Sequence, residues 1–131
     1  MRLNVLLGIA ALCTMVLTMT ASAHHSHSNY EITEFRQLEG IVTQIHLLVP
    51  HSWVYLEVKD ESGVAEKWAL EATGPRGLER RGIKREDVKV GDRVTVRCHP
   101  LRDKSRGCLL GFLTPAHGDM ARGHGVEREW D

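Results

Sequence analysis

The chain has 131 residues, and its 17 Lys and Arg residues balance its 17 Asp and Glu residues, so it carries no net charge with histidine neutral. This balance excludes a general electrostatic attraction to nucleic acid or to an anionic membrane. The length corresponds to one small domain with a modest core, and the eight histidines are many for a chain of this size.

The first 23 residues have the three parts of a cleaved secretory signal. Arg2 supplies the positive start, segment 3–19 is mostly apolar, and Ala21-Ser22-Ala23 has the A-x-A pattern of a cleavage site. An uncleaved anchor is the alternative, but the apolar run is barely long enough to span a bilayer. We therefore expect a periplasmic or secreted mature protein that starts at His24 and keeps no stable membrane anchor.

Five segments of the mature chain have the alternation or the β-branched content of strands: 37–49, 52–59, 64–72, 93–99 and 108–114. A polar, aperiodic segment, 24–36, precedes them and is expected to form an arm. Gly40 interrupts the first segment, which indicates a bend or bulge. In the last segment, Leu110 and Phe112 are expected to share one face.

A short helix is predicted between the third and fourth strands. Pro75 suits its first position and Gly82 its end, and Leu78 is expected to point inward. The order of three strands, a helix and two strands matches an all-β fold, a small five-stranded OB-like barrel over residues 37–115. Residues 116–131 are rich in Gly and charge and are expected to form a flexible tail, with His117 and His124 as passive members.

Two cysteines remain after signal cleavage, Cys98 and Cys108. An even pair in an exported protein is most simply a disulfide, and both residues lie in predicted strands that flank one loop. The alternative is a thiolate metal site that uses Cys98 next to His99.

The order of several short motifs resembles a family of small exported bacterial proteins of uncharacterised function. The residues that carry the resemblance are Ala23-His24-His25-Ser26, Gly40, Pro50-His51, Trp68, Gly91-Asp92 and His99-Pro100. Val49 departs from the family pattern, which has Asn there, and His27 stands where an aromatic residue is common. The resemblance implies the compartment and the fold, and no activity.

The histidines nominate a metal site. His51 is predicted in the loop between strands one and two, and His99 at the entry to the loop between strands four and five. OB-folds bind ligands with these two loops, which we expect at the same end of the barrel, within reach of an arm that carries His24, His25 and His27.

Imidazole is a common metal ligand, and an amino terminus on His24 adds a second nitrogen. Such nitrogen-rich sites suit Cu(II), with zinc as the alternative. The competing interpretation is a solvated arm, with His51 and His99 bonded only to their own loops. His46 is expected to be a strand-face residue rather than a ligand.

A plain binding module is the rival function. Trp53 and Tyr55 alternate onto the outer face of the second strand, the region where OB-folds bind oligonucleotides and oligosaccharides. Export makes nucleic acid an unexpected ligand, which leaves a glycan or a periplasmic protein partner. No nucleophile elbow, paired-carboxylate signature or phosphate loop is present, so the sequence favours binding over catalysis without deciding whether the protein is an enzyme.

Overall fold

The computed structural model describes residues 27–131. The expected signal peptide, its cleavage site and the histidines at positions 24 and 25 lie outside the described residues. The elements are β1 (Arg36–His46), β2 (His51–Lys59), β3 (Ala65–Thr73), α2 (Pro75–Arg80), β4 (Arg93–Pro100), β5 (Gly107–Pro115), the 3-10 helix η1 (Met120–Arg122) and β6 (Arg128–Glu129).

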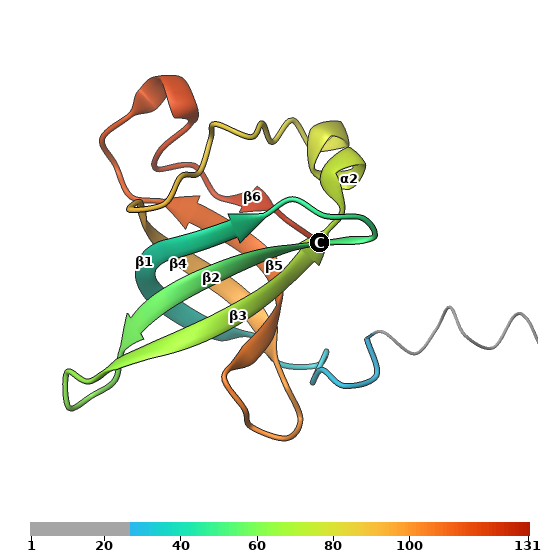
Figure 1. Ribbon diagram of the computed structural model, residues 1–131, viewed down its shortest axis with the longest axis vertical. Coiled ribbons are helices and arrows are strands. Elements are labelled where there is room, and N and C mark those ends of the chain that lie inside the picture. Colours follow the sequence, from blue (N-terminus) through green and yellow to red (C-terminus); the bar gives the residue numbers. More distant parts are fainter. Residues whose placement is uncertain (1–26) are drawn as a thin grey trace, which may run out of the picture.

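The strands form a closed barrel. Their order is β3-β2-β1-β4-β5-β6, and a further pairing between β3 and β5 closes the sheet on itself. This closing pair is parallel and joins residues 69–71 to residues 107–109, whereas the other pairings are antiparallel. Figure 1 shows α2 beyond the end of β3, at one mouth of the barrel. The predicted OB-like barrel with one short helix between its third and fourth strands is confirmed.

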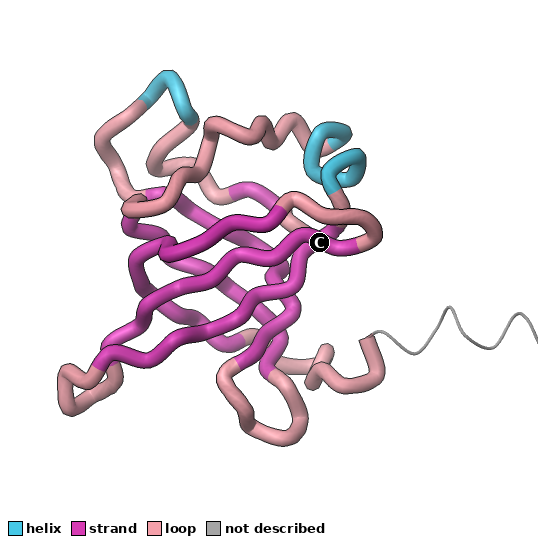
Figure 2. Tube along the Cα trace, viewed as in Figure 1, coloured by secondary structure: helices cyan, strands magenta, loops and turns pink. Residues whose placement is uncertain are grey.

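Alternation along the strands determines which side chains form the core. In β2, Ser52, Val54 and Leu56 are fully buried while His51, Trp53 and Tyr55 lie on the outer face. Aliphatic residues of all five barrel strands fill the interior, and Leu78 from α2 packs against them as predicted. The strands, magenta in Figure 2, surround this apolar core, and the helices lie at one end of the barrel.

Gly40 and a bulge give β1 its curvature. A Cβ atom on Gly40 would lie 2.5 Å from the backbone oxygen of Glu57, so only glycine lets β2 approach this closely. The pairing of β1 with β2 then shifts register between Val42 and Gln44. Such a bulge bends the strand, and it allows β1 to pair with β2 on one side and β4 on the other.

A second bulge reverses one expected face in β5. Arg97 pairs with Phe112 and Cys98 pairs with Leu110, so Gly111 between them has no partner in β4. Leu110 is therefore buried in the core, whereas Phe112 lies outside with its ring 4.3 Å from the guanidinium carbon of Arg97. The expectation that Leu110 and Phe112 share a face is wrong, because strict alternation fails across the unpaired residue.

The predicted disulfide between Cys98 and Cys108 is confirmed. Both residues are fully buried, and their Cα atoms lie 5.6 Å apart. The bridge ties β4 to β5 inside the barrel. Because it closes a short loop, we expect it to contribute about 2–3 kcal/mol to stability.

Residues 116–131 are packed against the barrel, and the expectation of a flexible tail is wrong. Trp130 is only 3% exposed and belongs to the core cluster. Its backbone accepts a hydrogen bond from the amide of Thr73 and donates one to the oxygen of Gly111, while β6 pairs with β5. The segment has few apolar residues, so its composition did not indicate that Trp130 would anchor it in the core.

None of the helices that the structure describes within residues 27–131 has the length and apolar character that a membrane crossing requires.

The buried Trp130 generates a stability prediction. Trp130→Ala should lower the free energy of unfolding by about 3–5 kcal/mol, because it removes a large buried side chain and leaves a cavity. Urea denaturation followed by circular dichroism measures this change. Val126→Ala, an exposed position in the same segment, is the matched control and should change stability by less than about 0.5 kcal/mol. A loss below about 1 kcal/mol for Trp130→Ala would contradict the assignment of Trp130 to the core.

Candidate functional site

His51 is the first residue of β2 and lies on the outer face of the barrel beside a buried carboxylate. Its Nδ1 atom is 3.1 Å from Oε1 of Glu71. Glu71 is on β3, where it pairs with Trp53, and it is only 8% exposed. A carboxylate only accepts hydrogen bonds, so the tautomer of a neutral imidazole that suits this contact carries its proton on Nδ1 and has Nε2 as its other, acceptor nitrogen.

The second oxygen of Glu71 is held by the N-terminal arm. The hydroxyl of Tyr30 donates a hydrogen bond of 2.5 Å to Oε2 of Glu71. Tyr30 is 5% exposed, and burial, together with this hydrogen bond and the negative charge of Glu71, raises the pKa of its phenol. Both oxygens of one buried carboxylate are therefore occupied, one by the arm and one by the imidazole.

Further contacts attach the arm to the end of β4. Tyr30 forms an isolated β-bridge with Leu101, and its backbone oxygen accepts a hydrogen bond from Nε of Arg102 at 3.0 Å. The amide of Glu31 donates to the backbone oxygen of Pro100. The described part of the arm thus follows β4 and reaches β3 through the ring of Tyr30, a placement that the sequence did not indicate.

His99 is also bonded through Nδ1, and its partner is a backbone carbonyl. The Nδ1 atom lies 2.7 Å from the oxygen of Glu34, and the ring stacks on Phe35 with centroids 4.1 Å apart. A carbonyl oxygen only accepts, so a neutral His99 also has its proton on Nδ1. The two histidines share this tautomer but contact different parts of the molecule.

The expectation that the two histidine loops lie at the same end of the barrel is wrong. β4 runs antiparallel to β1, with Cys98 paired to Arg36, so the β4–β5 loop lies where β1 begins and the β1–β2 loop where β1 ends. Figure 1 shows these loops at opposite ends of the barrel. The link between His51 and His99 runs across the strands instead, because Glu71 pairs with Leu109 and Leu109 pairs with His99.

Within residues 27–131, no group of three or more His, Cys, Asp or Glu side chains is arranged to hold a metal ion. His27 is exposed, and the predicted ligands at positions 24 and 25 lie outside the described residues. His46 makes an edge contact with the ring of Tyr55, with centroids 5.4 Å apart, so its prediction as a strand-face residue is confirmed. Each histidine of the described barrel could therefore give a metal ion only one ligand, without two further ligand groups beside it.

The two aromatic residues proposed for the alternative binding module are two positions apart in β2 and lie on its outer face. Trp53 and Tyr55 are both half-buried. The Tyr55 ring has the ammonium of Lys67 5.8 Å from its centroid. This face borders His51, so the two candidate sites are neighbours on β2.

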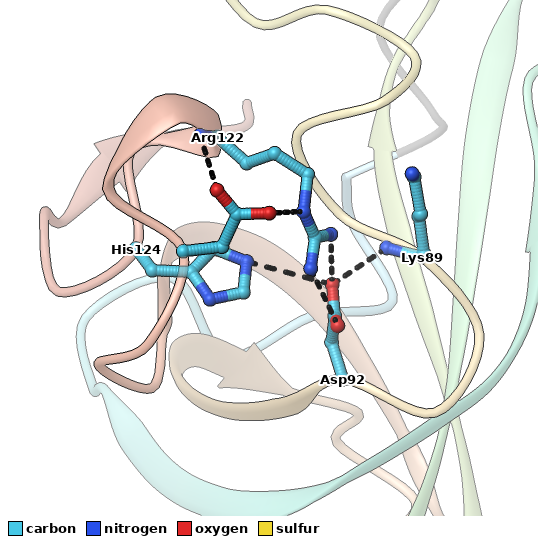
Figure 3. Close-up of polar contacts among 5 residues, drawn as sticks. Lys89, Asp92, Arg122 and His124 are labelled. Atoms are coloured by element: carbon cyan, nitrogen blue, oxygen red, sulfur yellow. Dashed lines mark hydrogen bonds and ion pairs between the residues drawn. The ribbon is translucent and has the colours of Figure 1, made fainter.

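The sequence did not indicate a second cluster of titratable side chains, around Asp92 and Arg122, which is shown in Figure 3. Asp92 precedes β4 and receives both terminal nitrogens of Arg122, at 2.8 and 3.2 Å. The Nε atom of Arg122 donates to Asp119 at 2.7 Å. His124, which is 7% exposed, has its Nε2 atom 3.7 Å from Asp92 and without a hydrogen-bond partner.

This cluster fixes the C-terminal segment to the turn before β4. Partial burial of Asp92 opposes its ionisation, but hydrogen bonds from Arg122 and from the Lys89 amide outweigh burial and lower the pKa of Asp92. His124 was expected to be a passive tail residue, and this is wrong because it is packed inside the cluster. Asp92 and Arg122 are separated by 30 positions in the chain, so no local pattern could have paired them.

Fold and outer face together define a small OB-like β-barrel with an N-terminal arm bound along β4. The chain belongs to DUF6152, a family of unknown function whose profile matches residues 12–110. Comparisons with curated proteins and with solved structures found no match.

Removal of the Tyr30 hydroxyl should release the arm. Tyr30→Phe leaves one oxygen of the buried Glu71 without its donor, which should cost about 1–3 kcal/mol. Amide hydrogen exchange at residues 30–34 should then be faster in Tyr30→Phe than in the wild type. Tyr55→Phe removes a phenol from the outer face of β2 and should leave exchange in the arm unchanged. Equal protection of residues 30–34 in the wild type and in Tyr30→Phe would show that this hydrogen bond does not hold the arm.

The Asp92 cluster should stabilise the protein in a pH-dependent way. Because the folded state lowers the pKa of Asp92, its contribution is present above about pH 4 and is lost as pH falls through the lowered value. The Tm difference between wild type and Arg122→Gln should therefore be largest above about pH 4 and should shrink as the pH falls further.

The matched control is Arg93→Gln, which removes an ion pair to Glu39 in which both side chains are largely exposed. Exposed pairs contribute little to stability, so its Tm should stay close to that of the wild type throughout. A pH-independent effect of Arg122→Gln would show that the guanidinium acts by packing alone.

Proposed function

We propose that this protein is exported to the periplasm or the exterior and binds a divalent metal ion, Cu(II) before zinc, through imidazoles of its N-terminal arm and of His51. Three features support export: the secretory pattern of residues 1–23, the buried disulfide and the resemblance to exported proteins. A disulfide is compatible with an oxidising compartment. His99 is the further ligand candidate on the barrel.

The observation that carries the proposal is the pair of His51 and Glu71. Histidines that bind metals almost always donate their other ring N–H to a carboxylate, a carbonyl or water, which fixes the tautomer and increases the basicity of the ligand. The 3.1 Å contact between Nδ1 of His51 and Glu71 supports such an arrangement, in which Nε2 would bind the ion. His99 has the carbonyl version of the same arrangement through Glu34.

Tyr30 supplies the connection to the arm. Its hydroxyl and the ring of His51 contact the same carboxylate, while its backbone pairs with Leu101 just after β4. His27 is three residues from Tyr30 and His24 is six, which correspond to spans of at most about 11 and 22 Å. An amino terminus at His24 would add an amine to the imidazoles, and a set of nitrogen donors favours Cu(II).

A second candidate function uses Trp53 and Tyr55 to bind a glycan or a periplasmic protein partner. It is favoured by one observation, that both rings are half-buried and half-accessible on the same face of β2. Aromatic side chains of this kind supply a large contact area with one polar edge. The two candidates share β2, so single substitutions at neighbouring positions separate them.

Copper titration of the mature protein tests the proposal, after mass spectrometry has established His24 as its first residue. His51→Ala should weaken Cu(II) binding at least about tenfold, and Glu71→Gln about 10- to 100-fold, since Glu71 orients the ligand. Binding should also weaken below about pH 6.5, because imidazole must be unprotonated to coordinate. Paramagnetic resonance should show fewer nitrogen ligands in His51→Ala.

Trp53→Ala is the matched control on the same face of β2 and should leave copper affinity unchanged. If His51→Ala and Glu71→Gln bind copper with the wild-type affinity and spectrum, the barrel takes no part and the proposal is wrong. A ligand lost with Trp53→Ala and kept with His51→Ala would support the aromatic binding module instead.

A further inference from the structure

An open hollow of about 530 Å³ lies where β3 meets the β4–β5 loop and the start of β1. It is separate from His51 and from the Asp92 cluster. Its lining residues are mostly cationic: Arg36, Glu66, Lys67, Trp68, Lys104, Ser105 and Arg106. The chain as a whole is neutral, so this concentration of positive charge is local.

Four cationic side chains face a single carboxylate in this lining. Arg106 forms an ion pair with Glu66, and this hydrogen bond is the main reason that the pKa of Glu66 is lowered. Glu66 is therefore ionised and orients Arg106. Among the described residues, Lys67 and Lys104 have no ion pair. Among the same residues, the ammonium of Lys67 has only the ring of Tyr55 as a partner, 5.8 Å from the ring centroid.

Trp68 adds its ring and its indole N–H to this group. Its side chain is buried. Its indole N–H lies near Glu66 and helps to lower the pKa of that carboxyl, although the pair does not meet the geometry of a hydrogen bond. The guanidinium carbon of Arg36 lies 4.8 Å from the Trp68 ring centroid. Stacking of this kind holds a guanidinium in a fixed plane and leaves its N–H edges available to an anion.

The loop that carries Lys104 and Arg106 is held in one conformation. The side chain of Asp103 accepts hydrogen bonds from the amide and the hydroxyl of Ser105, at 2.9 and 2.6 Å. The amide of Ala69 donates to the oxygen of Arg106 at 3.1 Å, and the disulfide joins the strands on either side of the loop. A fixed loop does not need to be ordered when a ligand binds, which favours affinity.

We propose that this hollow binds a phosphate-type oxyanion, either as a free ion or as the headgroup of an anionic lipid. Guanidinium and ammonium groups make strong charge-assisted hydrogen bonds to such oxygens. Four cations around one concave surface supply both the charge and the N–H donors. The carboxylate of Glu66 keeps Arg106 in place and would favour ligands that bind the other three cations.

Titration of the mature protein with inorganic phosphate tests the inference by NMR. Saturable shifts should appear at the amides of residues 104–106 and at the indole N–H of Trp68, and should weaken as salt is added. Lys67→Gln together with Lys104→Gln should raise the dissociation constant about tenfold or more. A parallel sedimentation assay with phosphatidylglycerol and phosphatidylcholine vesicles distinguishes the two sources: binding to the anionic vesicles alone identifies a headgroup, and phosphate binding without vesicle binding identifies a free ion.

The matched control is Lys84→Gln together with Arg85→Gln, which removes the same charge beside α2 at the other end of the barrel. It should leave the phosphate affinity unchanged. Two outcomes would overturn the inference: no saturable binding of phosphate or of anionic vesicles by the wild type, or an equal loss of affinity in both double variants. Neither test depends on His51, so the outcome is independent of the metal proposal.

Discussion

The short parallel pairing between β3 and β5 closes the barrel, and the other features of the outer face depend on it. Three residue pairs make this seam. On its inner side Cys108 is bonded to Cys98, and on its outer side Glu71 accepts the Tyr30 hydroxyl. Parallel strands need a long crossover connection, so the seam joins parts of the chain that are distant in sequence. A disulfide inside the barrel and a buried hydrogen bond outside it therefore stabilise the pairing of β3 with β5, which local sequence patterns do not specify.

Both candidate sites lie along this seam. The carboxylate of Glu71 orients His51 just beyond the last pair, while Arg106 and the cationic hollow lie just before the first. Opening β3 from β5 would therefore separate His51 from Tyr30 and also displace the β4–β5 loop from Trp68. The barrel thus provides a rigid frame for two surfaces of different chemistry, one with the imidazole of His51 beside a buried carboxylate and one with positive charge. Sites supported by rigid strands hold their groups more accurately than sites on mobile loops.

Local patterns were sufficient to predict the strands, the helix and the disulfide. Val54 and Leu56 alternate with polar residues, and that alternation predicts burial directly. The features that the sequence could not indicate depend on partners far along the chain. The buried Glu71 is one of them, because its hydrogen-bond donor Tyr30 lies 41 residues earlier in the chain. Phe112 changed face because Gly111 is skipped in the pairing, and register shifts of this kind follow from the neighbouring strand rather than from the strand itself.

Trp130 completes a core that β1 to β5 and α2 leave open on one flank, where Leu78, Ile83 and Val88 also lie. A chain that emerges from a ribosome or a membrane pore with its N-terminus first cannot finish this core until residue 130 has emerged. A product that stops shortly before Trp130 would carry every barrel strand and still expose an apolar flank, which is the kind of surface that chaperones and proteases recognise. Because Trp130 lies so near the end of the described chain, the core is complete only when this last segment is present.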